Sequence, residues 1–139
     1  MRILTSMNLL IVDCDVNVNR ILRKIFVGMF DDIFEAIDGQ EGLEVFFDKA
    51  PDVVVAEVVM PRLNGWNMAK AIRRRKDLKQ PAIVFCTCIG PRLNEMTSPL
   101  YEADGFIDKP IIPEELIDVV ERAIQRRNEG DYDSPVVHP

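Results

Sequence analysis

The chain has 139 residues, a length typical of one domain, and its 47% hydrophobic content is enough for a core. Its net charge of −6 argues against non-specific binding of nucleic acid, and no apolar run is long enough for a transmembrane helix. The only histidine, His138, lies near the C-terminus, which excludes Ser-His and Cys-His catalysis within the domain. The cysteines at positions 14, 86 and 88 match no redox or zinc motif, so we expect reduced thiols and a cytoplasmic protein.

In chain order, short apolar runs alternate with amphipathic segments. The runs predict strands, and the segments with apolar residues every three or four positions predict helices. Pro91 and Pro99 confine the fourth helix to a short segment, and the basic cluster at 73–76 is interpreted as favourable charge at a helix C-terminus. The predicted elements are strand 7–12, helix 16–30, strand 32–37, helix 38–50, strand 52–56, helix 65–76, strand 81–86, helix 92–98, strand 105–108 and a helix beginning at Pro113.

Five strands that alternate with five helices predict an α/β fold with a parallel sheet. The runs at 9–12, 53–56 and 82–85 are continuously apolar, which is typical of central strands covered on both faces. We assign 1–127 to the domain and interpret the polar, proline-containing segment 128–139 as a tail or linker. The helix residues predicted to face the core are Val18, Ile21, Leu22, Ile25, Met29, Leu43, Phe46, Phe47, Trp66, Ala69, Ile72, Leu116, Ile117, Val120 and Ile124.

Chemically useful side chains follow four of the predicted strands. In an open parallel sheet, ligands gather outside the carboxyl ends of the strands. Two carboxylates, a hydroxyl and an ammonium at that edge suggest phosphoryl and metal chemistry, although any one of them could simply end a strand. The residues are Asp13 and Cys14 after the first strand, Glu57 after the third, Thr87 after the fourth and Lys109 after the fifth.

Five motifs, "LLIVDCD", "AIDGQEGLE", "VVVAEVVMPRLNGW", "PAIVFCTC" and "GFIDKP", resemble those of bacterial response-regulator receiver domains of the CheY-like type. The resemblance covers residues 7–127. It implies a flavodoxin-like, doubly wound, five-stranded parallel sheet of order 2-1-3-4-5 with helices on both faces. It also implies roles for single residues: Asp13 as a magnesium-binding acid, Thr87 and Lys109 as contacts to phosphoryl oxygens, Phe106 as the switch aromatic and Lys109–Pro110 as a cis peptide bond.

Two positions depart from the family pattern. Glu57 stands where the family has the phosphoacceptor aspartate, and Cys14 stands at the second metal-binding acid. The extra methylene moves the carboxylate by about 1.5 Å, and a misplacement of about 1 Å can cost roughly a hundredfold in rate. A thiol is a poor ligand for magnesium. We therefore expect no required cofactor, with at most weak magnesium binding by Asp13 and Glu57.

Several readings of these residues stay open. In one interpretation, Glu57 pairs with Lys109 and thereby fixes one signalling state. In the other, Glu57 only neutralises Lys109 in a rigid structure and has no signalling role. Asp15 could take the place of Cys14 in the acidic pocket, and Cys14 could act as a redox sensor. We interpret Cys86 as a core or near-core thiol, as we do Cys88, and expect no disulfide between either of them and Cys14.

The sequence predicts an atypical receiver domain that works by protein–protein contact, without phosphorylation and without enzymatic activity. By resemblance, the contact face is the fourth helix, fifth strand and fifth helix, and the partner is a histidine kinase, an effector domain or another signalling protein. We expect no direct nucleic-acid or membrane binding, and a homodimer stays open. Two rivals remain: a conventional magnesium-dependent receiver that takes phosphate on Glu57 or Asp13, and a redox or metal sensor built on Cys14.

Overall fold

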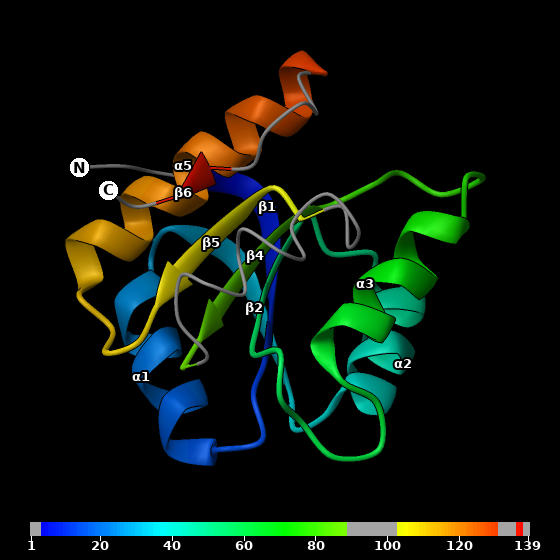
Figure 1. The fold of residues 1–139 in the computed structure, drawn as a ribbon. Coiled ribbons are helices and arrows are strands. Elements are labelled where there is room, and N and C mark those ends of the chain that lie inside the picture. Colours follow the sequence, from blue (N-terminus) through cyan, green and yellow to red (C-terminus); the bar gives the residue numbers. More distant parts are fainter. Residues whose placement is uncertain (1–3, 89–102, 131–135, 138–139) are drawn as a thin grey trace.

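A parallel β-sheet forms the middle layer of the computed structural model, which describes residues 4–88, 103–130 and 136–137 (Figure 1). The strand order is β2-β1-β3-β4-β5-β6. Helices α1 and α5 cover one face of the sheet, and α2 and α3 cover the other. The elements are β1 (Leu4–Val12), α1 (Val16–Phe26), β2 (Phe30–Ala36), α2 (Gly39–Lys49), β3 (Val53–Ala56), α3 (Gly65–Arg74), β4 (Ala82–Thr87), β5 (Gly105–Asp108), α5 (Pro113–Glu129) and β6 (Val136–Val137).

The five predicted strands are confirmed, in the order that the resemblance implied. The sheet also has a sixth strand, β6, which lies within the segment 128–139 and pairs in parallel with β5. Helix α5 runs to Glu129, two residues past the expected end of the domain at 127. The predicted helix 92–98 lies outside the described residues.

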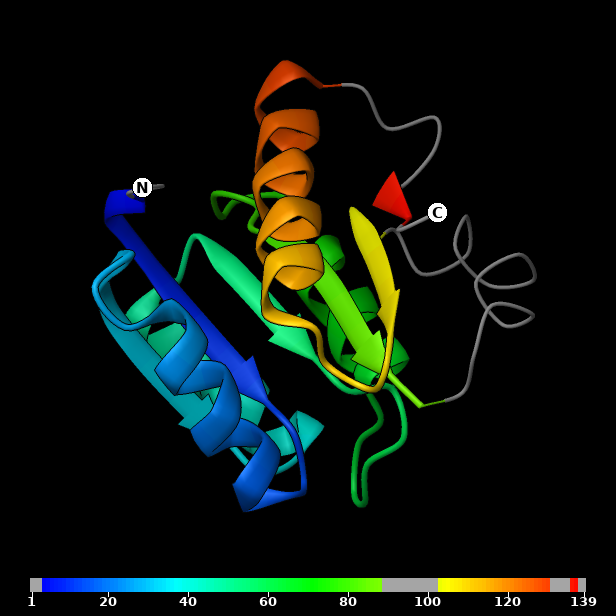
Figure 2. The same cartoon turned by 90° about the vertical axis from the view of Figure 1, so that its left-hand side faces the viewer.

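Two core clusters lie on opposite faces of the sheet. One fills the space between the sheet and α1 and α5, and Figure 2 shows these two helices in front of the strands. The other lies between the sheet and α2 and α3. Strands β3 and β4 are buried along their whole length, so they carry apolar side chains on both faces, as predicted.

Helix α1 is shorter than predicted and turns differently toward the core. It ends at Phe26 instead of residue 30, because Val27 takes an extended ψ of 132° and Gly28 follows with a positive φ of 85°. Ile21 was predicted to face the core, but it is 48% exposed. Asn19 is buried instead, and its side-chain amide donates to the carbonyl oxygens of Asp13 and Ala36.

The predicted inward position of Phe47 on α2 is also wrong. Its side chain is 46% exposed and packs edge-on against Phe46, while the Arg75 guanidinium lies 5.2 Å from the Phe47 ring centre. A cation over an aromatic face is favourable at an exposed site. Phe47 therefore links α2 to the end of α3 without entering the core. The apolar stripe predicted for α5 is confirmed at all four positions.

Candidate functional site

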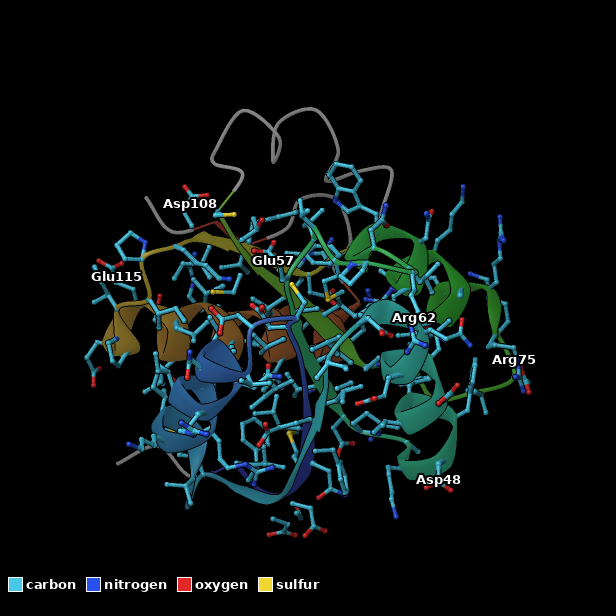
Figure 3. All side chains as sticks on the ribbon, turned by 90° about the horizontal axis from the view of Figure 1, so that it is seen from below. Asp48, Glu57, Arg62, Arg75, Asp108 and Glu115 are labelled. Carbon is cyan, nitrogen blue, oxygen red and sulfur yellow. The ribbon has the colours of Figure 1, made fainter. Side chains whose placement is uncertain are left out.

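The predicted site residues gather where the strands end, on the edge of the sheet that Figure 3 views. Glu57 lies near the middle of this edge, between Asp108 and Arg62. The parallel register aligns the strand ends, because Val12 lies beside Ala56, and Ala56 lies beside Phe85. Backbone bonds continue the alignment past the strands, from Glu57 N–H to Val12 O at 2.9 Å and from Lys109 N–H to Thr87 O at 2.8 Å.

Lys109 lies between the two buried carboxylates of the site. Its ammonium donates to Asp13 Oδ2 at 2.9 Å and to Glu57 Oε1 at 3.1 Å. Asp13 is 2% exposed and Glu57 is 5% exposed, so both charges lie largely out of water. Buried charges require such pairing. The predicted contact between Glu57 and Lys109 is present, together with a second one from Lys109 to Asp13.

Four hydrogen-bonding groups hold the Glu57 carboxylate. Its Oε2 accepts from the backbone N–H of Val58 at 2.6 Å and of Val59 at 3.3 Å, while Oε1 accepts from Lys109. The Thr87 side chain also hydrogen-bonds to this carboxylate. Thr87 is fully buried at the end of β4. The extra methylene of glutamate thus brings the carboxylate to both residues that the resemblance assigns to phosphoryl oxygens.

These contacts set the ionisation of the site. Burial alone would raise the pKa of Glu57, but the hydrogen bond from Thr87 and the charge and hydrogen bond of Lys109 together lower it below 4.5. Burial would likewise lower the pKa of Lys109, yet hydrogen bonds and charge from Asp13 and Glu57 raise it above 10.5. At neutral pH Glu57 is therefore a carboxylate and Lys109 an ammonium.

Asp13 is positioned by the start of α1. Its Oδ1 accepts from the backbone N–H of Asp15 at 2.9 Å, and its carbonyl oxygen accepts from Asn19. Asp15 itself is exposed, and its side chain caps α1 by accepting from the N–H of Asn17. The Asp15 carboxylate is therefore engaged in a helix cap, which gives the alternative of Asp15 as a pocket acid no support.

Cys14 lies at the surface beside these carboxylates. Its thiol is exposed, with Sγ 3.9 Å from the carbonyl oxygen of Val59. All three cysteines are free, as expected. Cys86 is buried as predicted, and burial raises its pKa to about 12, whereas Cys88 is exposed and does not belong to the core.

Phe106 faces inward from β5. Its side chain is 1% exposed, and its ring centre lies 5.6 Å from that of Phe85 on β4. It belongs to the core cluster on the α2 and α3 face of the sheet. The peptide bond between Lys109 and Pro110 is cis, at the position where the resemblance implies one.

The donor set fits magnesium poorly. In the part of the chain that the structure describes, no group of three or more His, Cys, Asp or Glu side chains could hold a metal ion. The carboxylates of Asp13 and Glu57 offer hard oxygen ligands at this site, but Lys109 already bridges them. Magnesium needs near-octahedral oxygen coordination, so it would have to displace Lys109 and gain no help from the Cys14 thiol.

The loop after β3 is fixed to the neighbouring helix by residues that sequence reasoning missed. Asp38 is buried, and its carboxylate caps α2 through the N–H of Glu41 and pairs with Arg62. The cap and Arg62 lower the pKa of Asp38 despite its burial. Gly65 must lack a side chain here, because a Cβ would lie 2.3 Å from the carbonyl oxygen of Glu57. These contacts hold the backbone that carries Glu57.

A second buried charge cluster lies at the opposite end of β5 and was also missed. The Asp104 carboxylate, which is fully buried, pairs with Arg73, Arg126 and Arg127 and accepts from the backbone N–H of Ile83 at 2.9 Å. Arg73 belongs to the basic cluster that was read as a favourable helix end, and it does lie in the last turn of α3. The spacing of these four residues in the sequence does not predict that they form a cluster.

Comparisons with known proteins identify the family of the chain. The family model for the response regulator receiver domain matches residues 9–121. A probable transcriptional regulator, ycf27, from Guillardia theta is 31% identical over 132 residues, covering 94% of this chain and 50% of that protein. The homologous ycf27 of Cyanidium caldarium is 32% identical over 124 residues. The chain spans about half the length of these curated relatives.

Solved structures share the fold. A putative response regulator from Chloroflexus aurantiacus superposes with a TM-score of 0.78 at 26% identity, over 86% of this chain and 98% of that one. The chemotaxis response regulator CheY4 of Vibrio cholerae superposes with a TM-score of 0.75, and at 24% identity it supports the fold alone. Among the described residues, no helix is both long and apolar enough to span a bilayer. The chain belongs to the response regulator receiver domains of two-component signalling, with a CheY-like, flavodoxin-type fold.

Proposed function

We propose that this receiver domain signals without phosphorylation, as a non-enzymatic protein-binding module of the cytoplasm that needs no metal. The observation that carries the proposal is the position of the Glu57 carboxylate. It already binds Thr87 and Lys109, the two residues that would hold a phosphoryl group in the family. An acceptor whose oxygens are all engaged, beside a thiol instead of a metal ligand, is badly placed for in-line attack on phosphorus.

Glu57 then acts as a permanent, partial substitute for the phosphorylated side chain. A carboxylate has fewer oxygens and less charge than a phosphoryl group, but it supplies the same two partners with negative charge. The inward position of Phe106 agrees with one fixed state, because its ring packs on Phe85 in the same strand pair that holds Thr87. The alternative that Glu57 only satisfies Lys109 predicts the same contacts but no effect on partner binding.

The proposed partner is a histidine kinase, an effector domain or another signalling protein. By resemblance it binds the face formed by the fourth helix, β5 and α5, with Phe106 beneath it. The negative charge of the chain fits a protein partner better than direct binding of nucleic acid. We propose that the segment 128–139, which contains the end of α5 and the short strand β6, serves as a tail or linker, and a homodimer stays open.

Phosphoryl transfer can be tested by intact mass spectrometry after incubation with Mg²⁺ and a small acyl-phosphate donor. Three proteins are compared: the wild type, the double variant Glu57→Asp/Cys14→Asp, and Glu57→Asn/Cys14→Asp as a matched control without an acceptor. We expect an adduct on the first double variant alone. Labelling of the wild type would overturn the proposal and restore a conventional phosphoacceptor.

A second comparison distinguishes the proposed function from the rival hypothesis of a redox sensor built on Cys14. Cys14→Ser keeps the size of the side chain and removes the thiol chemistry. If the protein works through Glu57, we expect the variant to bind its partner as the wild type does under oxidising and reducing conditions. A loss of redox-dependent binding in Cys14→Ser would favour the rival instead.

A further inference from the structure

Strand β6 occupies the edge of the sheet beside β5. In this pair Val136 lies opposite Gly105, and Val137 lies opposite Phe106. The backbone N–H of Val136 donates to the carbonyl oxygen of Asp104 at 2.7 Å. Without β6, β5 would be an edge strand with unpaired backbone groups, which is a ready template for another strand. Figure 2 shows β6 beside β5, at the far edge of the sheet from β2.

The edge is built to receive a strand. The Asp104 side chain is fixed by Arg73, Arg126 and Arg127, so the carbonyl oxygen that accepts from Val136 has a fixed position. Gly105 allows close approach, because a Cβ there would lie 3.2 Å from the Val136 carbonyl oxygen and 3.0 Å from Val119 Cγ1. The Val136 side chain packs against the core cluster beneath α5. Backbone pairing and a side-chain contact thus coincide at one residue.

The occupant is short. Within the part of the chain that the structure describes, β6 consists of two residues, Val136 and Val137. An occupant of this length is a weak competitor, whose advantage is that it belongs to the same chain.

We infer that the outer edge of β5 is a docking site for an extended peptide segment of a partner protein, and that the chain's own residues 136–137 occupy it as an internal competitor. The segment that fits carries a β-branched apolar residue at the position of Val136 and adds to the sheet in parallel. Because β5 also carries Phe106, a docked strand lies beside the proposed switch residue. The inference rests on the β5–β6 pairing and not on how Glu57 works.

The test uses the full chain and two substitutions of one residue. Val136→Pro removes the N–H that reaches Asp104, whereas Val136→Thr keeps both the N–H and the β-branched shape. Amide NMR signals of Gly105 and Phe106 report the edge. We expect these signals to shift in Val136→Pro and to stay near their wild-type positions in Val136→Thr. Identical spectra for Val136→Pro and the wild type would show that the edge is not occupied in solution, which would overturn the inference.

Docking from outside is tested by adding a synthetic peptide of residues 131–139. We expect it to return the Gly105 and Phe106 signals of Val136→Pro toward their wild-type positions at millimolar concentration. The wild type should need about tenfold more peptide, because its own strand competes at high effective concentration. A peptide with proline in place of Val136 is the control. If the unmodified peptide leaves the signals of Val136→Pro unchanged, or acts equally on both proteins, the inference is wrong.

Discussion

Glu57 couples the ionisation of the site to the stability of the fold. Its pKa in the folded protein lies below the ordinary value of 4.5, which also describes the unfolded chain. A depressed pKa means that the unfolded state binds the proton more readily. The stabilisation by Glu57 is therefore complete above about pH 5 and is lost as the pH falls through 4.5 toward the folded pKa.

This sign gives a prediction for Glu57→Gln. The substitution keeps the shape but removes the charge that faces Lys109, so we expect a loss of about 1–3 kcal/mol in the free energy of unfolding at pH 7. The gap between the two proteins should narrow as the pH falls to about 3, because the wild type then protonates Glu57. Urea unfolding at both pH values measures it, and a gap that widens at low pH would contradict the assigned pKa direction.

The three cysteines differ in reactivity for reasons of burial. Cys14 and Cys88 are exposed, whereas Cys86 is buried with its pKa raised to about 12. A thiol reagent attacks the thiolate, which Cys86 hardly forms and cannot present to solvent. We expect a disulfide-exchange reagent at pH 8 to titrate two thiols rapidly in the native protein and a third only in denaturant. Rapid titration of all three would place Cys86 at the surface.

Sequence reasoning reached the site residues but not their surroundings. Strand ends are readable because apolar runs stop at Asp13, Glu57 and Thr87, and parallel strands bring their ends together. The sequence left the role of Asp15 open, because a carboxylate at a helix start serves equally well as a cap. Whether such a side chain points to the pocket or to the helix depends on backbone angles, and spacing does not record those.

At the scale of elements, the cluster around Asp104 ties α3, β4, β5 and α5 together. The carboxylate is fully buried, and its partners come from the last turn of α3 and the last turns of α5. Sequence patterns missed it because its members are 31, 22 and 23 residues from Asp104, separations that no local periodicity links. Only the packed fold brings them into contact.

Removal of the central charge should therefore be costly. Asp104→Asn leaves three guanidinium groups without their carboxylate, and breaking such a buried pair typically costs about 3–5 kcal/mol. Asp118→Asn is the matched control, since Asp118 makes an exposed contact of 3.5 Å with Arg122 one turn away on α5. Its loss should stay within about 0.5 kcal/mol. Chemical denaturation of both variants distinguishes them, and similar losses would show that the Asp104 cluster contributes no more than a surface pair.

At the scale of the whole molecule, the order of the five main strands was predictable, but the edge strand β6 and the exposed faces of the helices were not. Continuous apolar runs predict the buried strands β3 and β4, and helical periodicity predicts the α5 stripe. Strand β6 has two residues in a polar, proline-containing segment, so no window contains enough pattern to predict it. Ile21 and Phe47 were wrongly predicted to face the core, because apolar residues are also common on the surface.

Magnesium binding can be tested through the thermal stability of the whole molecule. A ligand that binds only the folded state raises the unfolding free energy by RT ln(1 + [L]/Kd), about 1.4 kcal/mol at ten times Kd. For a domain of this size that corresponds to roughly 4–6 °C in Tm. In the wild type, Lys109 bridges the two carboxylates of the metal site. In Glu57→Asp/Cys14→Asp the shorter carboxylate at position 57 leaves room for a metal ion, and a carboxylate at position 14 replaces the thiol as an oxygen ligand.

We therefore expect Mg²⁺ to raise the Tm of the double variant by several degrees and to leave the wild type within about 1 °C, with sodium chloride at matched ionic strength as the control. The comparison distinguishes the loss of metal binding from the misplacement of the acceptor carboxylate, which a failure of phosphorylation alone does not distinguish. If Mg²⁺ stabilises both proteins equally, Lys109 yields to the metal in the wild type, and only the length of Glu57 opposes phosphoryl transfer. If it stabilises the double variant alone, the ammonium of Lys109 permanently replaces the cation, and a partner must recognise a site whose charge does not change.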